Sequence, residues 1–313
     1  MWSRSRTPMI HSLNFRRLGM SICASIALVP LGLRAEIIEP DARYPEGPLW
    51  HRGRLYFAEM SGERIAVWDG RSVRRFWQRP GCGPTSIAYA PDGFIVACHA
   101  ERVLARIGAG GRTISIIARD ASGRPIGNPN DTIADGRGGV YFSTSGVFAV
   151  SAPATGRVYY LPPSGAPREV AGKIRYANGV VLSPDRRYLF VSAHLGRRVL
   201  RFEIGQKGRL GGRQVFVRLD RLAPAAKDAD PLAGPDGLAF DRQGNLYIAE
   251  YGAGRILVVG PDRRLVKIIT VRNRFVTNLV FGPRGKTLYV TAPASNEVWP
   301  YRGAILRIDD PLG

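Results

Sequence analysis

Short apolar runs separated by turn residues dominate the chain after residue 35. In residues 175–193, the apolar run 180–182 is followed by a turn at Pro184 and Asp185 and by a second apolar run, 188–191. A proline beside an aspartate favours a type I turn, and two β-rich runs around such a turn predict a β-hairpin. The stretch therefore predicts two short antiparallel strands.

The same hairpin occurs six times, at intervals of 39 to 57 residues. Its second strand begins at an apolar residue in each repeat: Leu55, Phe94, Val140, Leu189, Leu246 and Leu288. Repeats of about 40–50 residues with several strands each are typical of propeller blades. A helical solenoid would need long stretches with a 3.6-residue period, and the sequence has none after residue 35. We expect an all-β fold, a six-bladed β-propeller.

Each repeat contains a further strand candidate, and most of these begin with arginine: 64–68, 102–107, 157–161, 198–204, 255–259 and 304–308. Residues 37–39 are also β-rich but have no hairpin partner. We expect them to form the missing outer strand of the last blade. This pairing would close the ring and leave no open sheet edge.

A polar residue begins the first strand of every repeat. The six are Glu46, Thr85, Asn130, Asn178, Asp236 and Asn278. Because the first strand of each blade lines the axis of a propeller, we expect these residues to meet at one end of the channel. Carboxylate and amide oxygens without Cys or His favour a hard cation, Ca²⁺ ahead of Mg²⁺. Each residue alone is also typical of a local turn, but the shared register in six repeats favours a joint site.

The ends of the second strands return to the same face, because the two strands of a hairpin are antiparallel. They carry a wider ring of residues: Glu59, His99, Thr144, His194, Glu250, Tyr251 and Thr291. Each of these is also typical of a solvated loop. His99 and His194 are the candidates for substrate contact, since an imidazole can hydrogen-bond or take a proton near neutral pH. Motifs for a serine nucleophile or a zinc protease are absent from the sequence.

The first 35 residues predict a signal peptide. Four arginines precede an apolar run at 18–33, and the first acidic residue is Glu36. The run is short for a membrane span and ends in a cleavage-like stretch. Cys23 lies inside the segment, but no good lipobox surrounds it. We therefore expect residues 1–35 to be removed, residues 36–313 to form the propeller, and the product to be periplasmic or secreted without a membrane anchor. Arg16 and Arg17 leave the twin-arginine and the general export routes both open.

The chain is strongly basic, with a formal net charge of +20. This charge can attract anionic substrates or an anionic envelope surface, although arginines scattered over turns and strand ends would give the same total. The sequence has no basic helix and no alternation of aromatic and basic residues of the kind that binds single-stranded nucleic acid. We expect a small-molecule partner and no nucleic acid.

Two cysteines remain after cleavage, Cys82 and Cys98. An exported protein can join such a pair. Folding the hairpin about Asp92 places Cys98 opposite Ser86, which leaves it about 13 Å from Cys82 at the rise of a strand. Since that separation exceeds bridging distance, we expect two free thiols unless the preceding loop doubles back.

Five segments together resemble the regucalcin/gluconolactonase family over essentially the whole mature chain. They are YPEGPLW (44–50), NPND (128–131), ANGVVLSPDRRYLFV (177–191), GPDGLAFDRQGNLYIAE (234–250) and TNLVFGPRGKTLYVT (277–291). The resemblance implies a six-bladed propeller that holds a divalent cation at the channel mouth, usually Ca²⁺, with Zn²⁺, Mn²⁺ or Mg²⁺ as alternatives. It also implies hydrolysis of a sugar lactone or a related cyclic ester.

The resemblance also assigns roles to particular residues. It implies that Glu46, Asn178 and Asp236 bind the metal, that Asp236 is the catalytic acid/base, and that Asn130 contacts substrate or metal-bound water. The further substrate-binding candidates are Thr85, His99, His194 and Asn128. Many family members have an arginine where this chain has Asn128, so the sugar specificity of the animal enzymes is not expected here.

The implied reaction is attack on a lactone carbonyl polarised by the cation, with Asp236 activating water or attacking directly. Two other interpretations stay open at this stage. The first is a non-catalytic propeller that binds a peptide or glycan on the same face. The second is a hydrolase of aryl or phosphate esters on the same scaffold.

Overall fold

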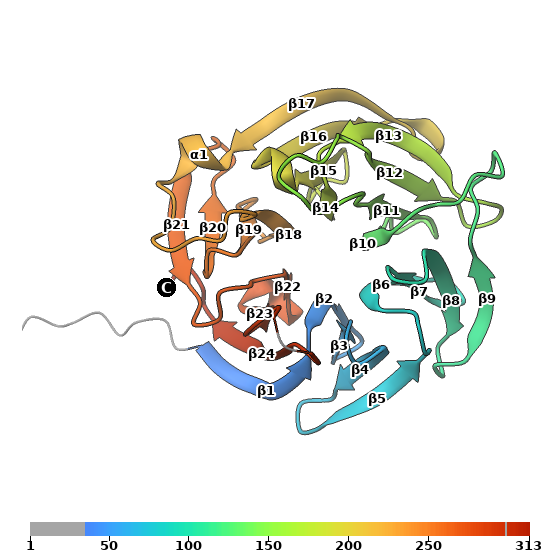
Figure 1. The fold of residues 1–313 in the computed structure, drawn as a ribbon, viewed down its shortest axis with the longest axis horizontal. Helices are drawn as coiled ribbons and strands as arrows, with labels where there is room; N and C mark the ends of the chain where they lie inside the picture. The colour runs from blue at the N-terminus through green and yellow to red at the C-terminus, as the bar shows by residue number, and fades with distance from the viewer. Residues whose placement is uncertain (1–34, 298) are drawn as a thin grey trace, which may run out of the picture. The chain divides into compact units, whose positions relative to one another are not determined.

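A ring of six four-stranded antiparallel sheets forms the protein (Figure 1). The computed structural model describes residues 35–297 and 299–313, and its strands confirm the six-bladed β-propeller predicted from the repeats. The predicted signal peptide lies outside the described residues except for Ala35. No helix within the described ranges has the length and apolar character needed to cross a membrane.

Each blade runs from an inner strand at the axis to an outer strand at the rim. The inner strands are β2 (Pro45–His51), β6 (Pro84–Ala90), β10 (Pro129–Ala134), β14 (Ala177–Leu182), β18 (Gly234–Phe240) and β22 (Asn278–Phe281). The second strands are β3 (Arg54–Glu59), β7 (Gly93–Cys98), β11 (Val140–Thr144), β15 (Tyr188–Ala193), β19 (Leu246–Tyr251) and β23 (Thr287–Pro293). The predicted starts of the second strands agree with these bounds to within one residue.

The third strands are β4 (Arg64–Trp68), β8 (Val103–Gly108), β12 (Gly156–Leu161), β16 (Arg198–Ile204), β20 (Arg255–Val259) and β24 (Arg302–Asp309). The outer strands are β5 (Val73–Gln78), β9 (Thr113–Ile117), β13 (Arg168–Ile174), β17 (Leu210–Arg218), β21 (Leu265–Thr270) and β1 (Ala35–Arg43). One short helix, α1 (Leu219–Leu222), and three 3₁₀ turns, η1 (His194–Gly196), η2 (Gln206–Gly208) and η3 (Pro283–Gly285), lie in the connections.

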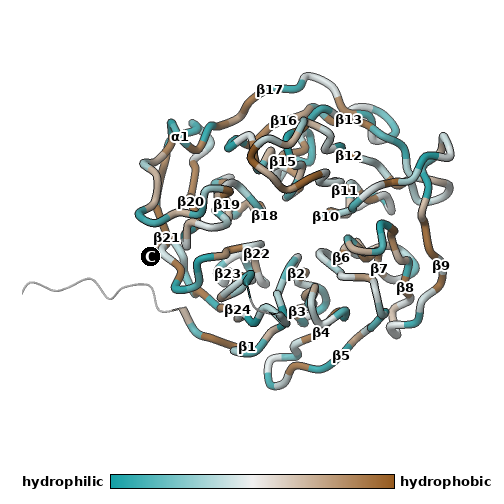
Figure 2. The backbone as a smooth tube through the Cα atoms, viewed as in Figure 1, coloured by the Kyte–Doolittle hydropathy of each residue, from teal (hydrophilic) through white to brown (hydrophobic). Residues whose placement is uncertain are grey.

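Apolar side chains fill the space between neighbouring blades. In β12, Val158 and Tyr160 pack toward the next blade, whereas Tyr159 and Leu161 pack toward the preceding one. This alternation follows from the two-residue period of a strand, which sends successive side chains to opposite faces. Apolar segments accordingly concentrate on the strands and polar segments in the connections (Figure 2).

The N-terminal strand β1 closes the ring. It pairs antiparallel with β24, so the last blade has the order β1-β24-β23-β22. The pairing places Ala35 opposite Ile308 and Arg43 opposite Arg302. This confirms that residues 37–39 belong to the outer strand of the last blade.

We predict that deletion of residues 36–42 lowers the melting temperature. The deletion exposes the edge of β24 and uncovers Ile305, which is fully buried. Thermal unfolding followed by circular dichroism measures the change, and the control is Glu39→Ala, which keeps the strand and alters one half-buried side chain. An unchanged melting temperature for the deletion would show that β1 does not stabilise the ring.

The expectation of two free thiols was wrong, because Cys82 and Cys98 form a disulfide with a Cα–Cα distance of 4.6 Å. A β-bulge at Thr85 shifts the register, so that Cys98 lies opposite Pro84 and not opposite Ser86. The backbone N–H of Ala100 also donates to the carbonyl of Cys82, at 3.1 Å. The loop before β6 therefore doubles back, which was the one exception that the simple hairpin register allowed.

We predict that the double variant Cys82→Ser/Cys98→Ser loses about 3 kcal/mol of stability, the loop-closure estimate for a bridge of this span. The bridged residues are separated by 16 positions in the sequence. Urea unfolding of the oxidised protein and of the variant measures the difference. Addition of a reductant should destabilise the parent protein and leave the variant unchanged.

Candidate active site

A β-bulge lies at the start of five of the six inner strands. The strand pairing shifts register across Thr85, Asn130, Asn178 and Asp236 and directly after Glu46, the polar residues singled out in the sequence. Bulges re-aim side chains and occur often beside active sites. The sixth strand, β22, pairs with β23 without a shift. This difference explains why Asn278, which occupies the equivalent position, does not line the pocket.

A glycine follows three of these residues and lets neighbouring inner strands approach one another. A Cβ on Gly179 would lie 2.1 Å from the backbone oxygen of Asp236. One on Gly237 would lie 2.5 Å from the Cα of Asn278, and one on Gly47 would lie 2.4 Å from the oxygen of Thr85. Only glycine fits such contacts, so the close spacing of the inner strands at the site depends on these three glycines.

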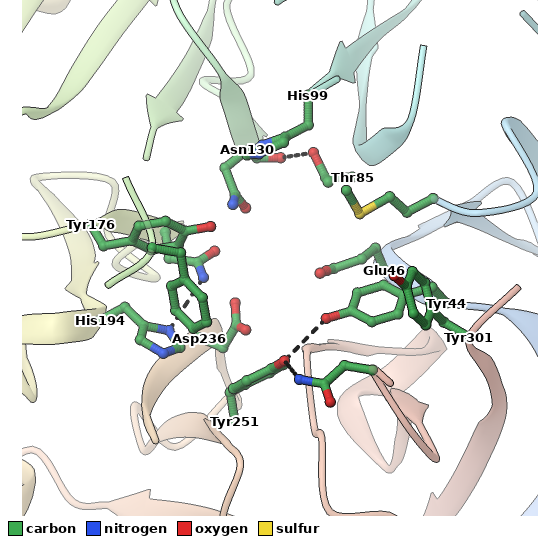
Figure 3. Close-up of a pocket in the computed structure, with 14 residues that line it drawn as sticks. Tyr44, Glu46, Thr85, His99, Asn130, Tyr176, His194, Asp236, Tyr251 and Tyr301 are labelled. Carbon is green, nitrogen blue, oxygen red and sulfur yellow. Dashed lines mark hydrogen bonds between the residues drawn. The ribbon is translucent and has the colours of Figure 1, made fainter. Parts of the chain in front are cut away.

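A pocket of about 270 Å³ opens at this end of the axis (Figure 3). Seven of the eight residues predicted for the site line it: Glu46, Thr85, His99, Asn130, Asn178, His194 and Asp236. The carboxyl groups of Glu46 and Asp236 point toward its centre from opposite sides (Figure 3). Asn128 does not line the pocket. Its side-chain amide donates to the backbone oxygen of His99, at 3.0 Å, and supports the loop from behind.

The wider ring of residues at the ends of the second strands contributes fewer side chains to the pocket than the sequence predicted. Besides the two histidines, only Tyr251 of that ring lines the pocket. Glu59 and Glu250 instead form ion pairs with the arginines that begin the third strands, Arg64 and Arg255. The arginine at the start of these two strands is thereby explained as the partner of a buried glutamate on the adjacent strand.

Three carboxyl groups share the buried end of the axis. Burial raises the pKa of Glu46 well above its usual value, and the nearby charge of Asp131 raises it further. The pKa of Asp236 is also raised well above its usual value, by burial and by repulsion from Glu46 and Asp131. Burial likewise raises the pKa of Asp131. Negative charge at this site therefore needs compensation, by protons or by a cation.

Asp131 acts as a structural anchor behind the pocket. One of its carboxyl oxygens accepts hydrogen bonds at 2.9 Å from Ser86 Oγ and from the N–H of Thr132, and the other accepts one at 2.9 Å from the N–H of Val180. The side chain of Asn278 also donates to it. Asp131 therefore links the inner strands of four blades and does not line the pocket itself.

His194 orients Asn178. Its Nε2 lies 2.9 Å from the carbonyl oxygen of Leu232, which can only accept, so Nε2 carries the proton. Its Nδ1 then accepts from the Asn178 amide, at 3.4 Å, and the same amide donates to Asp236. Burial lowers the pKa of His194 to about 4, which keeps the ring neutral at pH 7. The side-chain oxygen of Asn178 takes part in neither of these two hydrogen bonds.

His99 and Asn130 hold the opposite wall. The Nδ1–H of His99 donates to the carbonyl of Pro129 at 3.1 Å, so Nε2 keeps its lone pair. Burial lowers the pKa of His99. Asn130 donates through its amide to Ser145 Oγ, at 2.8 Å, and Thr85 Oγ1 donates to the Asn130 backbone, also at 2.8 Å. These contacts fix the amide of Asn130 at the pocket edge.

Most of the aromatic wall of the pocket was not predicted from the sequence. Tyr44, Phe148, Tyr176 and Tyr301 line it together with Met60 and Asn296. Tyr44 and Tyr176 each precede a site residue by two positions and have left-handed backbone angles, φ 51° and 56°. Such angles are rare for bulky residues and are typical of functional sites. The two-residue spacing that Tyr44 and Tyr176 share was the only feature of the sequence that could have identified them. Phe148 and Tyr301 lie in loops that do not repeat between blades.

Comparison with known proteins places the chain in a family. Residues 44–294 match the family model described as the SMP-30/gluconolactonase/LRE-like region. The chain belongs to this family. The resemblance seen in the five sequence segments is thereby confirmed.

Individual members of the family are distant in sequence. The gluconolactonase of Zymomonas mobilis is 24% identical, over 85% of this chain and 81% of its own length. A gluconolactonase structure from Xanthomonas campestris gives a TM-score of 0.72 at 23% identity and covers 88% of this chain and 90% of that one. The calcium-binding protein regucalcin from Agrobacterium tumefaciens gives 0.71 at 18% identity and covers 88% and 94%. These structural matches confirm the propeller fold.

The chemistry of the donor set fits a divalent cation. Glu46 and Asp236 supply carboxylate oxygens and Asn178 supplies an amide oxygen, the groups preferred by hard cations. The pocket lining within the described residues contains no Lys or Arg that would neutralise the acids. The described residues contain no cluster of three or more His, Cys, Asp or Glu side chains arranged to bind a metal ion. Any cation held here would therefore depend on the amide or on bound water in addition to the two carboxylates.

We predict that a divalent cation stabilises this family member more at about pH 8 than at about pH 5. The raised pKa values mean that the folded state binds protons more tightly than the unfolded chain does. In the metal-free protein, the contribution of Glu46 and Asp236 to stability is therefore fully present below the ordinary carboxyl pKa and is lost as the pH rises through the raised values. A cation replaces the protons, and so its contribution should grow with pH.

Thermal unfolding in EDTA and in Ca²⁺ at the two pH values measures this effect. The matched control is Asp262→Asn, which alters an exposed carboxylate on a turn outside the pocket. This variant should retain the pH-dependent effect. An equal shift of the melting temperature at both pH values would contradict the prediction.

Proposed function

We propose that the protein is a metal-dependent hydrolase that opens a lactone. The observation that carries the proposal is the pair of buried acids in the pocket, Glu46 and Asp236, with Asp131 behind them. Burial raises all three pKa values, and repulsion from neighbouring carboxylates raises those of Glu46 and Asp236 further. A cation relieves that repulsion and turns the group into a site for polarising an ester carbonyl. The gluconolactonases in the same family support a lactone as the substrate.

Glu46, Asn178 and Asp236 would hold the cation. When bound, it supplies a Lewis acid that stabilises negative charge developing on the carbonyl oxygen. We propose Ca²⁺, because the ligands are all oxygens and a family neighbour is a calcium-binding regucalcin. Zn²⁺, Mn²⁺ and Mg²⁺ are the alternatives to test.

Asp236 is the residue proposed to carry the reaction. As a general base it takes a proton from the attacking water and returns it to the ring oxygen when the carbonyl carbon–oxygen bond breaks. As a nucleophile it would attack the carbonyl carbon directly and form an anhydride as the bond to the ring oxygen breaks. Water would then hydrolyse the anhydride, which regenerates the Asp236 carboxylate and supplies the proton that the ring oxygen takes up. Neutral His194 fixes Asn178 beside it, and Asn130 and Thr85 form the neighbouring wall. The lone pair on His99 Nε2 is proposed to accept a hydrogen bond from the attacking water or from the hydroxyl group that ring opening creates.

The place of action remains a prediction. The signal peptide predicted for residues 1–35 indicates export, and the disulfide between Cys82 and Cys98 is consistent with an oxidising compartment. We therefore propose a periplasmic or secreted enzyme.

We predict that Asp236→Asn and Glu46→Gln each reduce kcat/KM for lactone hydrolysis by about 10³-fold or more, since each removes a charge on which the Lewis acid and the base depend. Proton release into a pH indicator measures turnover, and calorimetry measures cation affinity, which should fall in both variants. Asp262→Asn is the matched control and should retain activity. Full activity of the EDTA-treated parent would refute the metal-dependent mechanism.

A non-catalytic binding function would give a different result. The protein would then bind Ca²⁺ with measurable affinity and yet leave every lactone and aryl ester in a substrate panel intact. The proposed function requires turnover of at least one lactone with cation present and its loss in Asp236→Asn.

A further inference from the structure

Aromatic rings surround the candidate metal ligands on two sides. On one side, the ring centroid of Phe148 lies 4.7 Å from that of Tyr176 and 6.0 Å from that of Tyr251. On the other, Tyr44 and Tyr301 meet edge to face with centroids 5.7 Å apart. Figure 3 shows Tyr176 on one flank and Tyr44 with Tyr301 on the opposite flank, with the two carboxyl groups between them. A group bound over the carboxylates would therefore contact carbon-rich faces.

Most polar atoms of this wall are already hydrogen-bonded to protein. The hydroxyls of Tyr44 and Tyr251 bond to each other at 3.2 Å, and Asn296 donates to Tyr251 at 3.1 Å. Tyr176 bonds to Ser145, and both nitrogens of His194 are engaged. A polyhydroxylated ring needs several donors and acceptors, and burying its hydroxyls without partners is costly. Beyond the proposed metal ligands, this wall offers few such groups.

The wall also lacks positive charge. None of the 14 described residues that line the pocket is Lys or Arg, although the chain carries 45 of these residues in total. An anionic lactone, such as a phosphorylated or sulfonated sugar, would have no basic side chain to pair with. It would also lie close to the carboxyl groups of Glu46 and Asp236. The pocket therefore favours a neutral substrate.

The two loops that supply Phe148 and Tyr301 to the pocket carry further exposed apolar side chains. In the loop after β11, Val147 is 62% exposed, Phe148 37% and Val150 66%. In the loop after β23, Trp299 is 63% exposed, and its ring lies 5.4 Å from that of Tyr301. Exposed apolar residues scattered singly need no explanation, but several in the two loops that help line one pocket indicate a binding surface.

We infer that the substrate is a neutral lactone with an apolar alkyl or aryl substituent, and that Phe148 and the tyrosines of the pocket wall bind this substituent. The inference rests on the proposed lactone hydrolysis and specifies its substrate class. The ring carbonyl lies over the carboxylates, and the substituent extends along the aromatic wall toward the rim. The pocket of about 270 Å³ accommodates a lactone ring with a short chain.

The first experiment compares three lactones with Ca²⁺ present: D-glucono-δ-lactone, unsubstituted δ-valerolactone and δ-nonalactone, which adds a butyl chain. Burial of each methylene raises binding about fourfold, so kcat/KM should be about tenfold or more higher for δ-nonalactone than for δ-valerolactone. The sugar lactone should be the poorest of the three. A higher kcat/KM for the sugar lactone than for δ-nonalactone would overturn the inference.

A second experiment separates this inference from the proposed function. Lactams are not opened, so calorimetry with a butyl-substituted δ-lactam and with D-glucono-δ-lactam measures recognition alone. The alkyl lactam should bind more tightly, and tighter binding of the sugar lactam would overturn the inference whether or not the protein is an enzyme. A preserved alkyl preference with no turnover of any lactone would overturn only the hydrolase proposal.

Phe148→Ala tests the residue assignment. It should lower kcat/KM for δ-nonalactone about tenfold and leave δ-valerolactone nearly unchanged, because only the chain loses its contact. The control is Val266→Ala, which removes an exposed apolar side chain from the outer strand β21. Equal losses for both substrates would show that Phe148 supports the fold of the pocket and does not bind the substituent.

Discussion

Repulsion among the carboxyl groups of Glu46, Asp131 and Asp236 is the constraint on which the candidate site depends. The three acids come from different blades and are held together away from water. Burial raises the pKa of each, repulsion from Asp131 raises that of Glu46 further, and repulsion from both raises that of Asp236. Local structure alone would not bring them together. The apolar packing between neighbouring blades holds the inner strands in place, and Asp131 joins four of those strands through its hydrogen bonds. The stability of the ring thus maintains a site that is itself unfavourable without a proton or cation.

The architecture was predictable because its determinants are local and repeated. Strand alternation and turn residues gave the six hairpins, and the unpaired residues 37–39 gave the closing strand. The ring of polar strand starts was also predictable, since one register places equivalent residues at one end of the axis. Asn278 shows the limit of that argument: its strand lacks the bulge present in the other five, and the side chain turns to Asp131.

Features outside the repeat were not predictable in the same way. The bulge at Thr85 brought Cys82 and Cys98 together against the simple hairpin register. The orientation of Asn128, which supports His99 from behind the wall, depends on a hydrogen bond between blades. Phe148 and Tyr301 reach the pocket from non-repeating loops, so no periodic pattern marks them. Substrate recognition is therefore the part of the protein that the sequence alone describes least.

The closing pair of strands also constrains how the chain is assembled. Arg302 on β24 forms an ion pair with Asp41 on β1, a residue 261 positions earlier. A ribosome releases β1 long before β24, so β1 has no pairing partner until β24 has also been made. Contacts this distant in sequence form late and slowly. Until they form, the edges of the unfinished ring are unpaired, and unpaired strand edges favour aggregation.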